Sequence, residues 1–268
     1  MALPKFGVII SPYGNIIKDI EEYSSLGFDF LEFSLEEPFA VPGFFSKNKQ
    51  KILKLLDEHG MFATAHAPLT TALASDFKEV RIGWMKVIEN YMRVLKVLKV
   101  VKITFHTFHV IHSLKNEDSV EMQFLLNLEK NLNELIGSGN KYGMRIVVEN
   151  TMGKWGYGEV KYFKHLLDKV PNLGMNLDIA HAFIKGGMKN IENYVKLLGN
   201  KIEHMHMHDN HGELDEHLPI GKGKIDWEQV VRLLKKINYD KTITFEVFTS
   251  KKDAVKSREK IRELWMKK

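Results

Sequence analysis

Residues 100–106 read VVKITFH and show the pattern on which the fold prediction rests. β-Branched and aromatic residues dominate this run, as is typical of a β-strand. Side chains of a strand alternate between its two faces, so Ile103 and Phe105 share one face. Thr104 and His106 share the other face. The run therefore predicts a strand with one apolar face and one polar face, the polar face ending in a histidine.

Seven further runs of this kind follow one another along the chain, each succeeded by a longer amphipathic stretch. The runs are FGVIIS at 6–11, FDFLEFS at 28–34, MFATAH at 61–66, MRIVVE at 144–149, LGMNLD at 173–178, IEHMHMH at 202–208 and TITFEVF at 242–248. Helical patterns lie between the strands at 15–26, 46–59, 77–98, 119–141, 159–169, 188–198 and 226–237, and the last residues from 251 read as a further helix.

Eight strands that alternate with helices predict a parallel sheet closed as a (β/α)8 TIM barrel, an α/β fold. We expect one such domain over residues 1–268, a length at which these barrels commonly occur. An open, doubly wound sheet is the alternative. It is less favoured because neither a G-x-G-x-x-G motif nor a phosphate-binding loop follows the first strand.

Composition restricts the kinds of site and the location. The chain has no cysteine, which excludes disulfides and thiolate metal sites, so any metal must bind histidine and carboxylate ligands. No apolar run approaches the ~18 residues of a membrane span, and the N-terminal MALPKFGVIISPYG lacks a signal-peptide pattern. We therefore expect a cytoplasmic protein with no membrane partner and no obligate protein partner. The net charge of +5 is compatible with a phosphate-bearing substrate, and also with lysine-rich helix surfaces.

On six of the predicted strands the polar face carries an ionisable side chain at or near its C-terminal end. These residues are His66, His106, Glu149, Asp178, His206 and Glu246. The carboxyl ends of barrel strands all meet at one mouth, where barrel enzymes build their active sites. One histidine at a strand end is unremarkable, but six such ends indicate a shared site.

Three more candidate ligands lie just beyond strand ends. His181 follows Asp178 in LDIAHA, and Asp215 and His217 stand in LDEHLPIGKG, whose glycines allow the loop to bend back over the mouth. Nine such ligands exceed what one ion needs and suit two or three ions, of zinc, manganese or iron(II). Clustered ions assist displacement at phosphorus, whereas one deep ion polarises a sugar carbonyl or hydroxyl while a carboxylate moves protons.

Several motifs carry a resemblance that covers nearly the whole chain. They are AHAPLTTALAS at 65–75, TFHTFH at 104–109, VVENT at 147–151, LDIAHAF at 177–183, HMHDN at 206–210, DEHLPIGKGKIDW at 215–227 and FEVF at 245–248. In this order and spacing they resemble the xylose isomerase-like TIM-barrel superfamily and, within it, the endonuclease IV branch (AP endonuclease family 2).

The resemblance implies up to three zinc ions, with Glu149 and Glu246 as catalytic residues. The first ion would bind His66, His106 and Glu149; the second would share Glu149 and add Asp178, His206 and Glu246; the third would bind His181, Asp215 and His217. The implied reaction is hydrolysis of a phosphodiester, with abasic sites in DNA as the substrate.

A metal-dependent isomerase or epimerase of a sugar or sugar phosphate remains open as the alternative. Such members of the superfamily resemble this chain only at Glu149, Asp178, His206 and Glu246. Departures from endonuclease IV favour them: Leu69 replaces an aromatic residue, Ala72 replaces an amide, and Thr107-Phe108 stands where Pro-Gly is expected.

Further residues are expected to contact the substrate, which is either abasic DNA or a small sugar. These are His109, Trp155, His208 and Lys222. Trp155 could stack on a sugar ring or a base, or pack on its own barrel. His208 is expected at the rim, whereas His204 is expected in a lower polar layer and Glu32, at the end of the second strand, as a proton carrier or hydrogen-bond acceptor.

Overall fold

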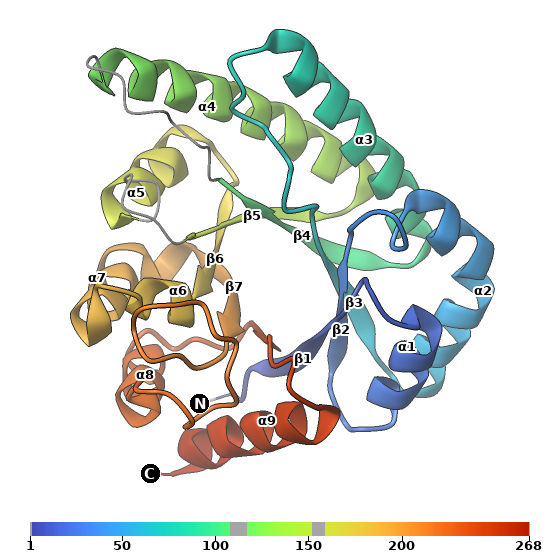
Figure 1. The fold of residues 1–268 in the computed structure, drawn as a ribbon, viewed down its shortest axis with the longest axis vertical. Coiled ribbons are helices and arrows are strands. Elements are labelled where there is room, and N and C mark those ends of the chain that lie inside the picture. The colour runs from blue at the N-terminus through green and yellow to red at the C-terminus, as the bar shows by residue number, and fades with distance from the viewer. Residues whose placement is uncertain (1, 108–116, 152–158, 268) are drawn as a thin grey trace.

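The computed structural model describes residues 2–107, 117–151 and 159–267. Eight parallel strands pair in sequence order, and β1 also pairs with β8, so the sheet closes into a barrel (Figure 1). The strands are β1 (Lys5–Ile10), β2 (Phe30–Ser34), β3 (Phe62–His66), β4 (Val100–His106), β5 (Arg145–Glu149), β6 (Gly174–Asp178), β7 (Ile202–Met207) and β8 (Thr242–Phe245). The predicted TIM barrel is confirmed, and closure rules out the open-sheet alternative.

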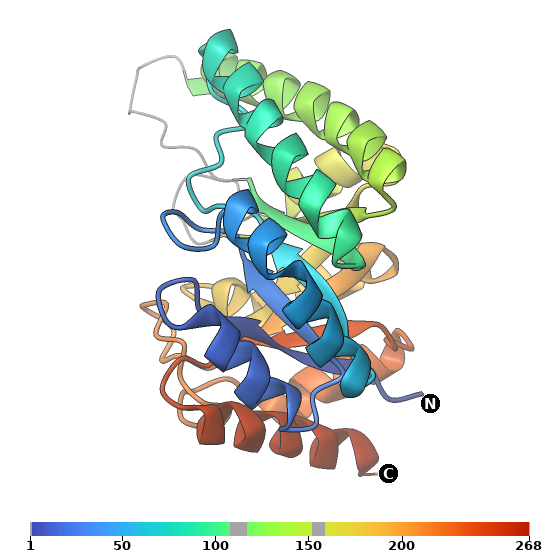
Figure 2. The same cartoon turned by 90° about the vertical axis from the view of Figure 1, so that its right-hand side faces the viewer.

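Helices surround the barrel, as Figures 1 and 2 show. They are α1 (Ile16–Ser24), α2 (Pro42–Glu58), α3 (Lys78–Val97), α4 (Glu117–Tyr142), α5 (Val160–Lys169), α6 (Ile179–Phe183), α7 (Gly187–Leu198), the short 3-10 helix η1 (Gly199–Lys201), α8 (Trp227–Lys236) and α9 (Lys251–Met266). Among the described residues, no helix has both the length and the apolar character needed to cross a bilayer.

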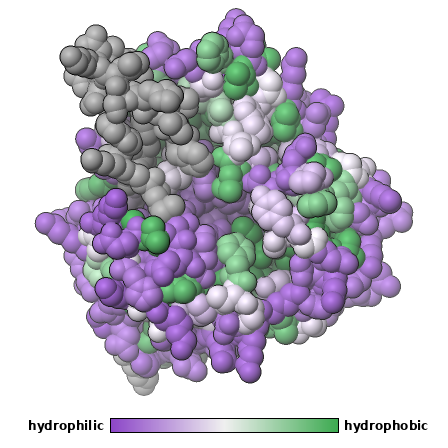
Figure 3. Space-filling model, in the orientation of Figure 1, coloured by the Kyte–Doolittle hydropathy of each residue, from purple (hydrophilic) through white to green (hydrophobic). Residues whose placement is uncertain are grey.

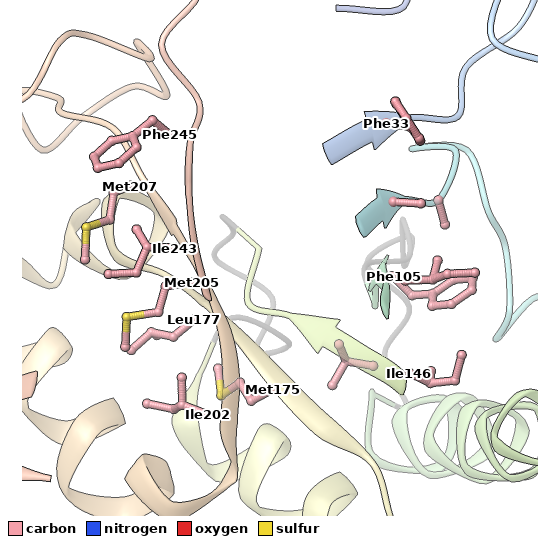
Figure 4. Close-up of a cluster of buried hydrophobic side chains, with 14 of the residues drawn as sticks. Phe33, Phe105, Ile146, Met175, Leu177, Ile202, Met205, Met207, Ile243 and Phe245 are labelled. Atoms are coloured by element: carbon pink, nitrogen blue, oxygen red, sulfur yellow. The ribbon is translucent and has the colours of Figure 1, made fainter. Parts of the chain in front are cut away.

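The apolar core lies between the strands and the helices. Strand β7 shows how the sequence produces it: Met205 and Met207 are fully buried on the helix-facing side, while His204 and His206 alternate with them. Figure 4 shows these methionines beside apolar side chains of the neighbouring strands, such as Ile243. Because the helices cover this face, the polar face of each strand must point into the barrel.

Close packing at two glycines fills the lower end of the barrel interior. A Cβ atom on Gly174 would lie 2.6 Å from Glu203 Cγ, and one on Gly7 would overlap the ring of Phe30. The Phe30 ring stacks on Phe62, with ring centroids 5.0 Å apart. Side chains larger than hydrogen at the two glycines would force this layer apart.

Successive layers of inward-facing side chains follow from the strand period of two. The layer of Phe30 and Phe62 lies toward the N-terminal ends of the strands. A buried polar layer follows it in the direction of the C-terminal mouth, and the strand ends follow that layer. The buried polar layer comprises Glu32, Thr64, Thr104, Asn176, His204 and Thr244. The predicted lower place of His204 is therefore confirmed.

Candidate active site

The predicted strand-end residues gather at the C-terminal mouth around one carboxylate, Glu149. Its Oε2 atom lies 3.2 Å from His66 Nε2 and 3.2 Å from His206 Nδ1. Its Oε1 atom lies 3.4 Å from His106 Nε2 and 3.3 Å from His181 Nδ1. Glu149 is thus a hub that joins four imidazoles, three from strand ends and one from α6.

A second carboxylate, Glu246, meets this hub at His206. Its Oε1 atom lies 3.2 Å from His206 Nδ1, the nitrogen that also faces Glu149. Ligand atoms of Glu149, Asp178 and His206 lie within 4.8 Å of one another. Asp178 is held in place because its Oδ1 accepts a hydrogen bond from the N–H of His181, capping α6 (2.6 Å). We call Glu149, Asp178, His206 and Glu246 the deep group.

An outer group, made up of His181, Asp215 and His217, lies above the deep one, whereas His66 and His106 contact Glu149. Asp215 Oδ2 is 3.3 Å from His181 Nε2 and 3.0 Å from His217 Nε2. His181 also touches the deep group through Glu149. The structure thus brings together all nine predicted ligands at one mouth.

His208 has a different place from the rim position expected of a substrate contact. It is fully buried, with Nε2 3.3 Å from Asp178 Oδ2 and 3.5 Å from Asp215 Oδ1. Its ring stacks on His217 at 4.1 Å. His208 therefore stands between the deep and outer groups as a tenth candidate ligand. The sequence signal was present, because His208 continues the alternation of His204 and His206.

Asp209 explains how the loop after β7 reaches back over the mouth. Its backbone exchanges hydrogen bonds of 2.8 and 2.9 Å with Leu218. Its carboxylate accepts from the N–H of Gly221 (2.7 Å) and from Trp227 Nε1 (2.9 Å). Asp209 is itself fully buried. These bonds hold both ends of the intervening segment, which carries Asp215 and His217 to the centre.

Burial and neighbouring charges determine the protonation of Glu149 and His181. Burial alone would raise the pKa of Glu149, but the imidazoles of His206 and His106 hold its pKa well below the usual value. Burial alone would lower the pKa of His181, yet the carboxylates of Asp178, Asp215 and Glu149 raise its pKa well above the usual value. Glu149 is therefore ionised at neutral pH, as a carboxylate that binds a metal must be.

Hydrogen bonds to backbone carbonyls fix which imidazole nitrogen carries hydrogen in three of the histidines. The Nδ1 atoms of His66, His181 and His217 lie 2.8, 2.9 and 3.2 Å from the carbonyl oxygens of Ala67, Asn150 and Glu246. A carbonyl only accepts, so each Nδ1 carries a hydrogen, and the neutral form of each ring, the form that binds a metal, has its lone pair on Nε2. This is the arrangement expected of metal-binding histidines.

Four buried atoms test whether these residues fit a metal. They are Asp178 Oδ2, His206 Nδ1, His208 Nε2 and Asp215 Oδ1, and none has a hydrogen-bond partner among the described residues. They nevertheless approach opposing ligand atoms to between 3.2 and 3.5 Å. Buried polar atoms without hydrogen bonds are costly, whereas a shared cation would satisfy them. The residues therefore fit a divalent metal, and mixed imidazole and carboxylate ligands suit zinc, manganese or iron.

Three predicted substrate contacts remain to be placed. His109 and Trp155 fall outside the described residues. Lys222 is exposed on a turn in which its N–H donates to the carbonyl of Pro219 (3.0 Å). Its role in substrate binding stays a prediction. Figure 3 views the mouth, with hydrophilic residues in the hollow at its centre.

A sequence model of the xylose isomerase-like TIM barrel family matches residues 20–268. The chain belongs to this family. It is 31% identical over 195 residues to an uncharacterised protein of Methanocaldococcus jannaschii, covering 72% of this chain and 74% of that protein. The superfamily prediction is thus confirmed, whereas the endonuclease IV branch is not singled out by this match.

Solved structures similar to the chain include several sugar epimerases. A D-tagatose 3-epimerase-like protein superposes with a TM-score of 0.84 at 28% identity, covering 97% of this chain and 96% of that one. A D-psicose 3-epimerase solved in the presence of D-fructose gives 0.76 at 15% identity, covering 97% and 99%, a likeness of fold alone. These neighbours agree better with the sugar alternative than with DNA hydrolysis.

Proposed function

We propose that the chain is a divalent-metal-dependent epimerase or isomerase of a small sugar, and that 3-epimerisation of a ketohexose is its reaction. One observation carries the proposal: the carboxylates of Glu149 and Glu246 approach the same nitrogen of His206, each at 3.2 Å. The resemblance to a D-tagatose 3-epimerase-like protein supports the choice of substrate.

Two facing carboxylates suit inversion of a carbon beside a carbonyl group. One carboxylate removes the proton from one side of that carbon, and the other returns a proton to the opposite side. A bound divalent cation would polarise the carbonyl oxygen and so acidify the neighbouring C–H bond. Glu149 is ionised at neutral pH and can accept a proton. Asn176 Nδ2 donates to Glu149 Oε2 (3.0 Å) and restricts the orientation of this carboxylate.

The same groups account for the proposed metal content. The deep group would hold the ion that orients the sugar oxygens. His66 and His106, which share Glu149 with the deep group, would hold a second ion, and the outer group, with His208, would hold a third. We propose zinc, with manganese or iron as alternatives.

A solvent-isotope experiment tests the function directly. We expect the metal-loaded protein in heavy water to convert D-fructose into its C3 epimer, with deuterium at C3 of the product, because the returned proton comes from a carboxylate that exchanges with solvent. NMR of the sugar measures both. Chelator-treated protein is the control. An aldose product with deuterium at C2, or deuterium at C1 of the recovered fructose, would instead indicate aldose–ketose isomerisation. A fully loaded protein that exchanges no sugar proton would contradict the proposal.

Phosphodiester hydrolysis, the first expectation from the sequence, is the second candidate. What favours it is the complete set of ligands beyond the deep group, including His66, His106 and the outer residues. The family match and the solved structures named above give DNA cleavage no support. The test is whether the metal-loaded protein nicks a DNA duplex with one abasic site, without added magnesium, and whether a chelator stops the reaction. Such nicking would favour hydrolysis over sugar epimerisation.

The double variant Asp215→Asn with His217→Gln tests the outer ion. We expect metal content to fall by about one ion per chain, because both changes remove charge or a lone pair from the outer group. We expect epimerisation to slow by about tenfold, at the lower end of the effect of residues that support a metal site. Elemental analysis after gel filtration and the sugar assay measure these two results.

The matched control lies on the same loop. His211 and Glu216 form an exposed pair, with His211 Nδ1 2.9 Å from Glu216 Oε2. His211→Gln with Glu216→Gln makes the same chemical changes and should leave metal content as in the wild type. An unchanged metal content in the Asp215–His217 variant would show that the outer group holds no ion.

A further inference from the structure

A carboxylate that reaches no substrate lies directly beneath the deep group. Glu32 of β2 is fully buried in the polar layer. Its Oε2 accepts hydrogen bonds from Thr64 Oγ1 (3.1 Å) and Thr244 Oγ1 (2.6 Å), and lies 2.8 Å from His204 Nε2. Its Oε1 lies 3.2 Å from His206 Nε2. One anion therefore interacts with four polar side chains from three other strands.

These contacts determine where the hydrogen of His206 lies. An ionised carboxylate accepts hydrogen bonds and donates none, so the Nε2 atoms of His204 and His206 must both carry hydrogen. A neutral His206 then has its lone pair on Nδ1. That atom points at Glu149 and Glu246, the side on which a cation would bind.

His206 is thus turned the opposite way from the other histidines whose hydrogen is fixed. His66, His181 and His217 give their Nδ1 hydrogen to backbone carbonyls and present Nε2 to the centre. His206 presents Nδ1. The difference follows from its partner, since Glu32 approaches from below, where no backbone carbonyl of the strand is directed.

A second set of contacts extends from Glu32 to the lower end of the barrel. His204 Nδ1 lies 2.6 Å from Thr242 Oγ1, which accepts a hydrogen bond from Lys102 Nζ (2.7 Å). An ammonium only donates, so the Thr242 hydroxyl accepts from Lys102 and can give its single hydrogen to His204 Nδ1. The Thr242 contact with the Glu203 carbonyl is longer, at 3.3 Å. The hydrogen bonds from Lys102 to Thr242 and from Thr242 to His204 thus run toward Glu32. Lys102 Nζ also donates to the Glu203 carbonyl (2.5 Å), and this buried ammonium supplies the charge opposite to that of Glu32.

We propose that Glu32 is a positioning residue that fixes His206 as an Nδ1 metal ligand, with Lys102, Thr242 and His204 as its buried support. The proposal rests on the metal centre of the proposed function. It accounts for an anion placed where neither solvent nor substrate reaches, a placement that would otherwise only cost stability.

A metal bound to Glu32, His204 and His206 themselves is the competing explanation, since ligand atoms of these three lie within 4.8 Å of one another. The protein's own donors argue against it. Oε2 of Glu32 accepts from two threonines and Oε1 faces His206 Nε2, while His204 Nε2 is held 2.8 Å from Oε2. A cation there would displace these bonds, and His206 would then bind it through Nε2.

The first test uses the unaltered protein loaded with zinc and labelled with ¹⁵N in its imidazoles. Long-range ¹H–¹⁵N correlation spectra assign the nitrogen that carries hydrogen and the nitrogen that binds zinc. We expect His206 to carry hydrogen on Nε2 and zinc on Nδ1, the reverse of His66. Zinc on Nε2 of His206 would overturn the proposal. No variant is needed, so this measurement does not depend on a mutant folding.

The second test is Glu32→Gln, which keeps the size of the side chain but replaces one acceptor with a donor. We expect zinc affinity, measured by competition with a chelator, to fall about 10- to 100-fold, the usual effect of losing a residue that orients a metal ligand. Asp29→Asn is the control: it removes a carboxylate just before β2 that accepts from the N–H of Phe6 (2.8 Å), far from the imidazoles. Unchanged affinity in Glu32→Gln would overturn the proposal.

The outcomes separate this inference from the proposed function. If the unaltered protein binds no zinc, the metal centre and the role of Glu32 both fall. If zinc binds His206 at Nδ1 but no sugar is epimerised, the role of Glu32 stands and the proposed function falls.

Discussion

Glu149→Gln is expected to release at least one metal ion and to slow sugar epimerisation by at least about a thousandfold. Two losses combine in this variant. The neutral amide removes the negative charge on which the His66–His106 and deep groups both depend. It also removes one of the two proton carriers, and such groups contribute about 10²- to 10⁴-fold to a rate.

Elemental analysis and the deuterium assay on the same preparation measure the two losses. Glu203→Gln is the matched control, because Glu203 belongs to a barrel strand but pairs with Lys241 (3.0 Å) and Arg145 (3.5 Å) away from the mouth. We expect the control to keep its metal and its rate. Wild-type turnover with full metal content in Glu149→Gln would remove Glu149 from the centre.

The variant should still fold, which keeps its result interpretable. A glutamine has nearly the volume of glutamate, and its carbonyl can accept the hydrogen bond from Asn176 Nδ2. What it cannot do is supply the negative charge that helps to raise the pKa of His181 and His206. In the metal-free variant the pKa of His181 should therefore fall, since Glu149 is one of the carboxylates that raise it.

The strand ends could be predicted because one regularity determines both fold and site. A period of two sends His106 inward whenever Phe105 faces the helices, and parallel strands place all their carboxyl ends at one mouth. The six strand-end residues follow from these two facts without any knowledge of long-range contacts. Strand β4 was predicted at its observed bounds, 100–106.

The partners of Glu32 could not be predicted from the sequence. Glu32 and His204 are separated by 172 residues and lie on β2 and β7, strands that do not pair with each other. Which side chains meet across the interior depends on the stagger between successive strands. That stagger includes register shifts at Ala63/Ala65 and at Met175/Asn176, which no local pattern reveals.

The burial of His208 depends on a loop rather than on a strand. Strand β7 ends at Met207. The period of two therefore predicts that the His208 side chain points inward, but it does not predict that His208 is buried. His208 is buried because the backbone bridge between Asp209 and Leu218 brings the loop back over the mouth. Pairing of residues nine positions apart within an irregular loop has no sequence signature comparable to that of a strand.

Glu246→Gln should separate proton exchange from epimerisation. Glu246 is one of the two proposed proton-transferring carboxylates, but it is not the carboxylate that contacts four imidazoles. The group of Glu149, Asp178 and His206 remains when Glu246 is changed, so the variant should keep its deep ion. We expect epimerisation to fall by about 10²- to 10⁴-fold, the contribution of one general acid or base. Glu149 can still remove and return a proton on its own side of the sugar.

The distinguishing measurement follows each epimer separately in heavy water. One epimer should lose its C3 proton signal to deuterium while its configuration persists, because Glu149 works on that side alone. The other epimer presents its C3 proton to the side of residue 246, and this proton should exchange no faster than it does without the protein. Exchange of both epimers at equal rates would show that a single group serves both sides, and Glu246 would then be a metal ligand rather than a proton carrier.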